Sequence, residues 1–151
     1  MKTKILTAIK LTVLALLLFS CKDEQVPTET IDPKLQRVIG DYKATKFKLP
    51  DPTDNTVDII AKGGSISTKI TKSATIEGRV IIPPGAFSSS YPGDDYYFSG
   101  KVVFIGNDSI KFNNTNNSLQ IAPFRIIGDS LKLEVFSIGY IGITLRKITG
   151  G

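Results

Sequence analysis

From residue 42 onward, apolar and polar residues alternate with a period of two over most of the chain. Ile66, Thr68 and Ile70 form one such series, and Leu131 and Leu133 begin another. This alternation predicts half-buried strands, because successive side chains of a strand point to opposite faces. We expect nine strands, at residues 42–49, 57–61, 66–70, 76–82, 96–105, 109–112, 119–127, 131–135 and 141–145.

Three local features refine this pattern. The alternation changes phase at Thr45-Lys46, which predicts a β-bulge in the first strand. Pro123 interrupts the segment 119–127 and indicates a bend or a sheet edge, because proline donates no ladder hydrogen bond. Gly128-Asp129 has the composition of a two-residue hairpin turn.

A single helical signal precedes the strands. Asp32-Pro33 is typical of a helix start, with a capping aspartate followed by proline at the first helical position. Leu35 and Val38 then follow at helical spacing, and Gly40 ends the turn. We expect one or two helical turns here.

Short strands joined by tight turns, without helical crossovers, favour an antiparallel meander. Two all-β architectures fit this pattern, a closed up-and-down barrel and a two-sheet sandwich. Closure removes exposed sheet edges, and the strand count suits a small barrel. We therefore expect residues 32–149 to form a small antiparallel up-and-down barrel of about eight to nine strands, with one short N-terminal helical turn.

Four sequence segments carry a family resemblance. Gly40-Asp41-Tyr42 follows the predicted helix, and the others are the segments at 77–83, 129–133 and 143–147. They resemble the lipocalin-like domains of lipid-anchored bacterial surface proteins, with Tyr42 at the tryptophan position of the lipocalin Gly-x-Trp opening. The resemblance spans most of 32–147, and it implies a barrel whose interior can hold one small apolar ligand.

The N-terminus has the composition of a secretion signal. Lys2 and Lys4 precede an apolar run at 11–19, which is far shorter than the ~20 residues of a membrane-spanning helix. The run ends in Leu18-Phe19-Ser20-Cys21, which resembles the lipobox of bacterial lipoproteins. This resemblance implies cleavage after residue 20, lipidation of Cys21, and anchoring through several acyl chains. The alternative is an ordinary secretory signal with a chance cysteine.

The residues after the lipidation site also form a motif. Lys22, Asp23 and Glu24 resemble the short acidic export signal of surface-exposed lipoproteins in some Gram-negative bacteria. We expect a protein in the outer membrane that faces the cell exterior, with residues 21–31 as a flexible tether. The alternative is that these charges belong to an ordinary solvated spacer.

Composition limits the chemistry of the domain. The chain has no His and no Trp, and Cys21 is its single cysteine. These counts exclude Ser-His-Asp and Cys-His sites, zinc sites built from His or Cys, and intramolecular disulfides. We expect no enzyme activity, no metal and no cofactor, with a hydrolase that uses an oxygen-ligated metal or carboxylates as a distant alternative.

The charge of the mature chain is close to neutral. Of the 19 basic residues, three (Lys2, Lys4 and Lys10) lie in the signal, which leaves 16 basic against 14 acidic residues. The basic residues are scattered singly along the sequence. A nucleic-acid partner is not expected, because nucleic acids require a concentrated basic face.

One segment combines aromatic rings with carboxylates. Tyr91, Asp94, Asp95, Tyr96 and Tyr97 lie at a junction of loop and strand, where they are candidates for the rim of a ligand site. The alternative is a turn followed by a strand whose aromatic residues alternate between core and surface. Asp94 and Asp95 are not an acid/base pair, because adjacent residues of a strand point to opposite faces.

The barrel interior is a second candidate site. A lipocalin-like interior holds either a ligand or side chains. Eight Phe and five Tyr supply enough volume to fill it, so a packed core and a cavity are both open at this point.

Two serines form a third group of candidates. Ser109 and Ser130 each follow an aspartate and precede an apolar residue. This pattern resembles the O-glycan acceptor of exported proteins in some bacteria. The alternative is turn chemistry, since Asp and Ser commonly cap turns.

Together these features predict a lipid-anchored, non-catalytic envelope protein that binds a small apolar or amphipathic ligand in its barrel. Its expected partners are the membrane, through acyl chains on Cys21, and that ligand. The alternative is a structural or assembly subunit of an outer-membrane complex, with a packed barrel, a protein partner and no ligand.

Overall fold

The computed structural model describes residues 31–53, 55–113, 119, 122–136 and 139–148. The predicted signal peptide, Cys21, and the export motif Lys22, Asp23 and Glu24 lie outside the described residues. The expected tether 21–31 is described only at Ile31.

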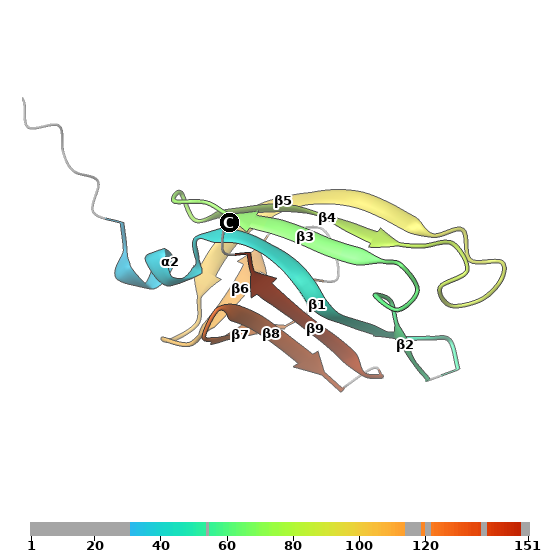
Figure 1. Ribbon diagram of the computed structural model, residues 1–151. Coiled ribbons are helices and arrows are strands. Elements are labelled where there is room, and N and C mark those ends of the chain that lie inside the picture. Colours follow the sequence, from blue (N-terminus) through green and yellow to red (C-terminus); the bar gives the residue numbers. More distant parts are fainter. Residues whose placement is uncertain (1–30, 54, 114–118, 120–121, 137–138, 149–151) are drawn as a thin grey trace, which may run out of the picture. The chain divides into compact units, whose positions relative to one another are not determined.

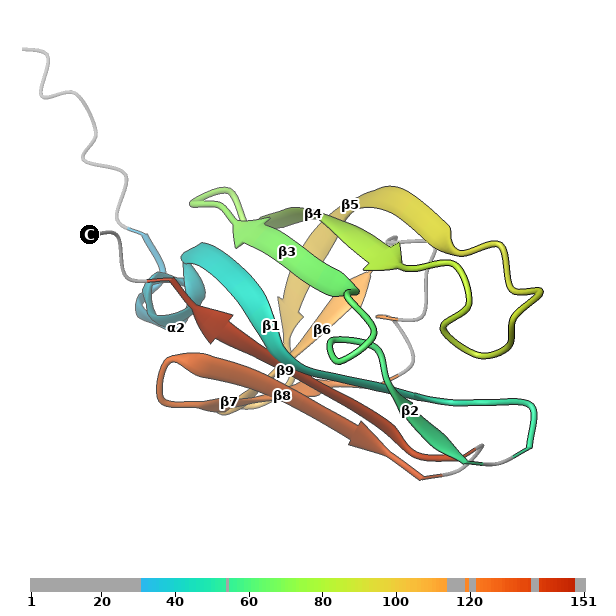
Figure 2. The ribbon, with the colours of Figure 1, turned by 45° about the vertical axis from the view of Figure 1, so that its right-hand side comes forward.

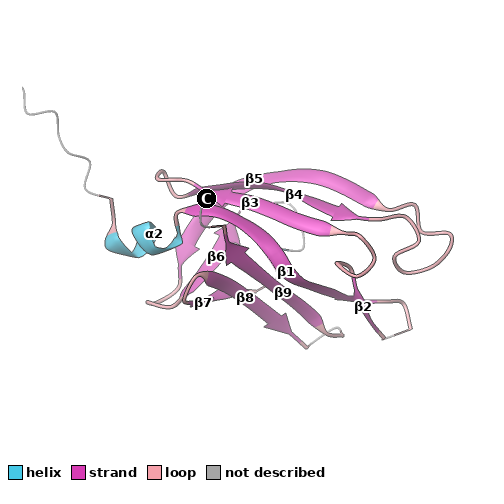
Figure 3. Cartoon of the chain, viewed as in Figure 1, coloured by secondary structure: helices cyan, strands magenta, loops and turns pink. Residues whose placement is uncertain are grey.

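The described part contains one short helix followed by nine strands (Figure 3). The elements are α2 (Pro33–Val38), β1 (Gly40–Pro50), β2 (Thr56–Asp58), β3 (Ser65–Ile70), β4 (Thr75–Ile82), β5 (Asp94–Phe104), β6 (Ser109–Asn113), β7 (Phe124–Ile127), β8 (Ser130–Val135) and β9 (Ile141–Lys147).

Eight of these strands form a closed antiparallel barrel (Figures 1 and 2). Strands β3 to β9 pair in chain order, and β9 returns to pair with β1, which also pairs with β3. Strand β2 is additional and pairs only with the far end of β1. The pairing of β1 with β9 confirms the expected barrel over the sandwich.

Strand β1 closes the barrel because it is long and bent. Its first residues, Gly40 to Lys43, pair with β3, and its last residues, Lys48 to Pro50, pair with β2. The register with β9 shifts between Ala44 and Lys46. This is the bulge that the phase change predicted.

Helix α2 lies beside the start of β1. Asp32 caps it by accepting a hydrogen bond from the Lys34 amide at 2.8 Å, as the sequence pattern predicted. Leu35 and Val38 are buried against the core. The hydroxyl of Tyr42 donates to the Val38 carbonyl at 2.8 Å and so ties the helix to the first strand.

Two predicted strands are shorter than expected. The segment 57–61 was predicted as a strand, but β2 ends at Asp58. The Asp58 carboxylate accepts hydrogen bonds from the amides of Ile60 and Ala61, which turns the chain there. The segment 119–127 was also predicted as one strand, but β7 begins at Phe124, after Pro123.

The barrel interior is filled with side chains. Most inward residues are only 0–2 % exposed, and they belong to one hydrophobic cluster that includes residues of every strand of the barrel. Phe112 of β6 and Phe124 of β7 are fully buried, with ring centroids 4.9 Å apart. Of the two alternatives for the interior, the packed core agrees with these exposures.

Candidate functional site

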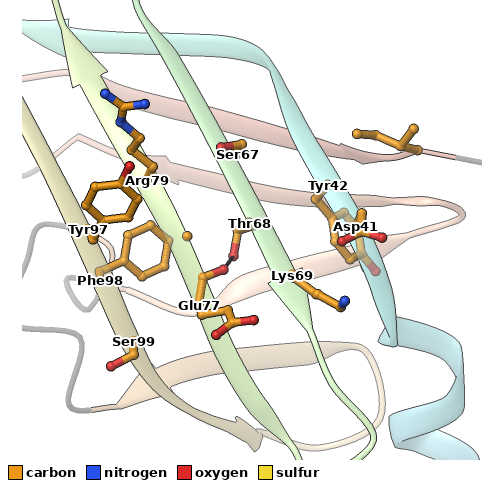
Figure 4. A pocket seen from close by; sticks show the side chains of 12 residues that line it. Asp41, Tyr42, Ser67, Thr68, Lys69, Glu77, Arg79, Tyr97, Phe98 and Ser99 are labelled. Carbon is orange, nitrogen blue, oxygen red and sulfur yellow. Dashed lines mark hydrogen bonds between the residues drawn. The ribbon is translucent and has the colours of Figure 1, made fainter.

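A hollow lies on the outer wall of the domain, over strands β1, β3, β4 and β5 (Figure 4). Its volume is about 800 Å³. It is lined by Asp41, Tyr42, Ser67, Thr68, Lys69, Glu77, Gly78, Arg79, Tyr97, Phe98, Ser99 and Ile148.

Strand register arranges the outward side chains of this hollow in two rows. In the first row, Tyr97 pairs with Arg79, and Arg79 pairs with Ser67. In the second row, the paired positions run Ser99, Glu77, Lys69 and Asp41, from β5 to β1. Each row therefore sets a short serine beside long charged side chains.

Arg79 in the first row is held by the Asp95 carboxylate. Its Nε donates to Oδ1 of Asp95 at 2.7 Å, and its Nη2 donates to Oδ2 at 2.5 Å. This bidentate ion pair fixes the plane of the guanidinium. The guanidinium carbon also lies 5.2 Å from the centroid of the Tyr97 ring. Hydrogen bonding to Arg79 lowers the pKa of Asp95, so the pair stays ionised at neutral pH.

The Tyr97 ring is the large exposed group of the hollow. Its side chain is 77 % exposed, although it stands in the middle of a paired sheet. Arg79 and Tyr97 lie together at one end of the hollow, while Glu77, Lys69 and Asp41 lie toward the other (Figure 4).

The second row is electrically balanced. Glu77 sits between Ser99 and Lys69 in the register, and Lys69 sits between Glu77 and Asp41. Together with Arg79, the lining contains two basic and two acidic residues. This arrangement offers alternating donors and acceptors without a strong field of either sign.

The predicted rim residues do not form one group. Tyr97 and Asp95 lie on the outer wall with Arg79. The hydroxyl of Tyr91 donates to Asp94, and burial, followed by this bond, raises the pKa of Tyr91 to about 12. Tyr96 is partly buried against the core.

Sequence reasoning therefore identified only the β5 side of this hollow. It missed Arg79, Glu77, Lys69 and Asp41, because single charges on the polar face of a strand are usual for a solvated surface. A signal was present in the serine at 99, which is the shortest outward residue of a strand whose other outward residues are larger.

A second cluster involves β1 and β8, together with Phe136 just after β8 and Tyr140 just before β9. Lys46 donates to Glu134 at 3.0 Å and to the Tyr140 hydroxyl, and both bonds raise the pKa of Lys46. The Tyr140 ring packs 5.1 Å from Phe136, which is 75 % exposed. Ile127 is 51 % exposed and lines a smaller hollow of about 290 Å³ with Phe136.

The candidate glycan acceptors lie where hairpins enter strands. Ser109 is the first residue of β6, and its carbonyl accepts from the amide of Ile105. Ser130 is the first residue of β8 and pairs with Ile127 across the predicted two-residue turn. These positions fit the turn chemistry of the sequence, and both side chains are partly exposed.

No helix among the described residues is long and apolar enough to span a membrane. No three His, Cys, Asp or Glu residues among those placed by the structure gather as ligands for a metal ion.

No protein-family model matches the chain, and no curated protein or solved structure was found to be similar to it.

Proposed function

We propose that this chain is a lipid-anchored, non-catalytic protein of the cell envelope that binds a small amphipathic ligand on the outer wall of its barrel. The observation that carries the proposal is the hollow of about 800 Å³ beside the exposed Tyr97 ring. Such a concave site, with an aromatic surface and a few fixed polar groups, is typical of ligand binding.

The packed interior moves the expected ligand from the inside of the barrel to its outside. Inward side chains such as Ile66, Val80 and Leu133 are at most 1 % exposed. A ligand inside the barrel would have to displace several of them, and each displaced side chain costs about 1.5–3 kcal/mol of burial energy. The outer hollow requires no such displacement.

The anchoring part of the proposal rests on the sequence. The lipobox ending in Cys21 supplies the membrane attachment, and Lys22, Asp23 and Glu24 supply the expected export to the cell exterior. A tethered barrel on that surface would meet small molecules from the medium. The absence of His from the whole sequence, together with one proposed lipid-bearing Cys, supports binding rather than catalysis.

The binding part is tested by NMR on the mature lipidated chain in micelles of lauryldimethylamine oxide. Three probes are titrated separately: decanoate, cholate and cellohexaose. We expect at least one probe to shift the amide signals of Ser67, Gly78 and Ser99. Shifts confined to inward residues such as Ile66 and Val80 would contradict the proposal, and so would no shift with any probe.

A second candidate function is assembly with an outer-membrane protein. It is favoured by the packed interior and by the exposed apolar side chains of Phe136 and Ile127. These two residues lie outside the large hollow and line the smaller one. Exposed apolar groups gathered beside a groove are typical of protein contacts. A photoreactive residue at position 136 should then give one crosslinked adduct in the native membrane, and Ile127→Glu should abolish it. The same residue at position 97 serves as the matched control and should give no adduct.

A further inference from the structure

We infer that the ligand of the outer hollow is a neutral oligosaccharide, with one sugar ring stacked on Tyr97. This inference rests on the proposed function and names the ligand class of the same site. Four observations carry it: the exposed ring, the fixed arginine, the balanced charge and the dimensions of the hollow.

The first observation is the exposed aromatic ring. Tyr97 is 77 % exposed and stands in a regular strand, paired with Arg79 on β4. A pyranose ring presents a face of C–H groups and an edge of hydroxyls. The C–H face packs on an aromatic ring, and the hydroxyl edge needs hydrogen-bonding groups around that ring. Arg79 already lies over one face of this ring, so Tyr97 offers a sugar its other face and its hydroxyl.

The second observation is the fixed arginine beside the ring. The two bonds from Asp95, at 2.7 and 2.5 Å, hold Arg79 in one orientation. They use only part of the donor set of the guanidinium, which has five N–H groups. Because Asp95 already holds the guanidinium in place, the Arg79 side chain loses little further conformational entropy when a hydroxyl binds to it.

The third observation is the charge of the lining. Lys69 and Arg79 are balanced by Glu77 and Asp41. A phosphate or a sulfated sugar would meet carboxylates as well as cations. A fatty acid chain would pack on apolar residues of the lining such as Phe98 and Ile148, but it would cover the two charged rows without offering them hydrogen-bond partners. A neutral sugar uses both signs, since each hydroxyl donates and accepts.

The fourth observation is the size of the hollow. Its second row crosses the strands β1, β3, β4 and β5, and its first row crosses β3, β4 and β5. Four strands spaced 4.7–4.9 Å apart span about 15 Å, which suits a short oligosaccharide better than a single ring. Ser67 on β3 leaves open space in the middle of this span, and Ser99 on β5 leaves it at one edge, where longer outward side chains would fill it.

The test uses the mature lipidated chain in lauryldimethylamine oxide, because alkyl glycoside detergents carry a sugar. The probes are cellohexaose, mannohexaose, xylohexaose and maltohexaose, with dextran sulfate and polygalacturonate as anionic comparisons. The chain has no Trp, so binding can be followed by the emission of its five tyrosines and confirmed by calorimetry. We expect one neutral hexaose to bind and the anionic polymers to bind more weakly.

Variants then separate stacking from other effects. Tyr97→Ala should weaken binding about tenfold or more, and Tyr97→Phe should stay within about threefold of the parent, because the ring carries the contact. Phe136→Ala is the matched control, because it removes another highly exposed aromatic ring outside the hollow, and it should leave binding unchanged.

Failure of this inference is distinguishable from failure of the proposed function. If decanoate or cholate shifts the amide signals of the hollow and no neutral hexaose binds, the sugar assignment is wrong and the outer binding site stands. Stronger binding of an anionic polymer, or sugar binding that Tyr97→Ala leaves intact, also overturns the assignment. If no probe of any class acts at the hollow, the proposed function itself fails.

Discussion

Gly78 of β4 lies directly opposite Phe98 of β5, and the phenylalanine ring occupies the space that a side chain at position 78 would need. A Cβ at this position would lie 2.6 Å from Cζ of Phe98 and even closer to the carbonyl oxygen of Ser67. The ring can rotate away, but that carbonyl belongs to the paired strand β3. The glycine is therefore required by the packing beneath the hollow.

We accordingly expect Gly78→Ala to destabilise the domain by about 1–3 kcal/mol, the usual cost of overpacking. Urea denaturation followed by circular dichroism measures this loss. Ser99→Ala is the control, because it changes an outward residue on the same sheet, and it should cost less than about 0.5 kcal/mol. Equal midpoints for Gly78→Ala and the parent would show that the sheet adapts and that the glycine is not required.

Tyr42 should make the domain sensitive to alkaline pH. Burial, and then the charge of Asp129, raises the pKa of Tyr42 to about 12 from its ordinary value of 10.0. The folded state therefore keeps the phenolic proton over a range in which the unfolded chain loses it. The contribution of Tyr42 to the free energy of unfolding is fully present below pH 10, and it falls by about 1.4 kcal/mol per pH unit between pH 10 and 12.

The variant Tyr42→Phe tests this dependence. It loses the 2.8 Å bond to the Val38 carbonyl and should be less stable at pH 7 by about 1 kcal/mol. Its stability should also fall less steeply than that of the parent between pH 10 and 12. The pKa of Tyr91 is also raised to about 12, and this residue is present in both proteins. The difference between their stability–pH curves therefore reports on Tyr42 alone. Parallel profiles would contradict the assignment.

The packed interior can be tested by opening it. Phe112→Ala removes a fully buried ring and its neighbour contact with Phe124, which should cost about 3–5 kcal/mol. Benzene should then raise the Tm of this variant, because an apolar cavity of that size binds it. The parent protein should show no such rise. A rise in the parent would indicate an interior that already holds open space.

The strand pattern was readable because each barrel strand has one buried face. The bulge near Thr45 was visible as a phase change, since a bulge shifts all later side chains to the other face. The end of β2 was not visible, because Asp58 turns the chain through its own side-chain bonds while apolar residues continue beyond it. The start of β7 was missed for the same reason, since apolar residues also precede Pro123.

The site was harder to predict than the fold because it depends on register between strands. The sequence indicates Asp95 and Tyr97 as candidates for a ligand site because they are close neighbours along the chain. Arg79 joins them only because β4 and β5 pair with Arg79 opposite Tyr97. A shift of two residues in that register would keep the buried face inward but move Arg79 away from its place opposite Tyr97. The lengths of the intervening loop and strands set this register, and the hydrophobic pattern alone does not specify it.

The N-terminal motifs lead to a prediction in cells. Cys21→Ser should abolish incorporation of labelled palmitate and release the protein from the membrane fraction, because the acyl chains provide the anchor. Asp23→Ala combined with Glu24→Ala should leave palmitate incorporation intact. It should, however, protect the domain from protease added to whole cells, since the export motif is lost while the anchor remains.

Gln25→Ala with Val26→Ala is the matched control for the acidic pair. It changes the same short segment but keeps Lys22, Asp23 and Glu24, so it distinguishes loss of the motif from a general effect of substitution in the tether. Continued protease access in the Asp23→Ala, Glu24→Ala variant would refute the export motif and leave the lipidation prediction standing. Palmitate incorporation in Cys21→Ser would refute the lipidation prediction itself, because the sequence contains no second cysteine for the thioether.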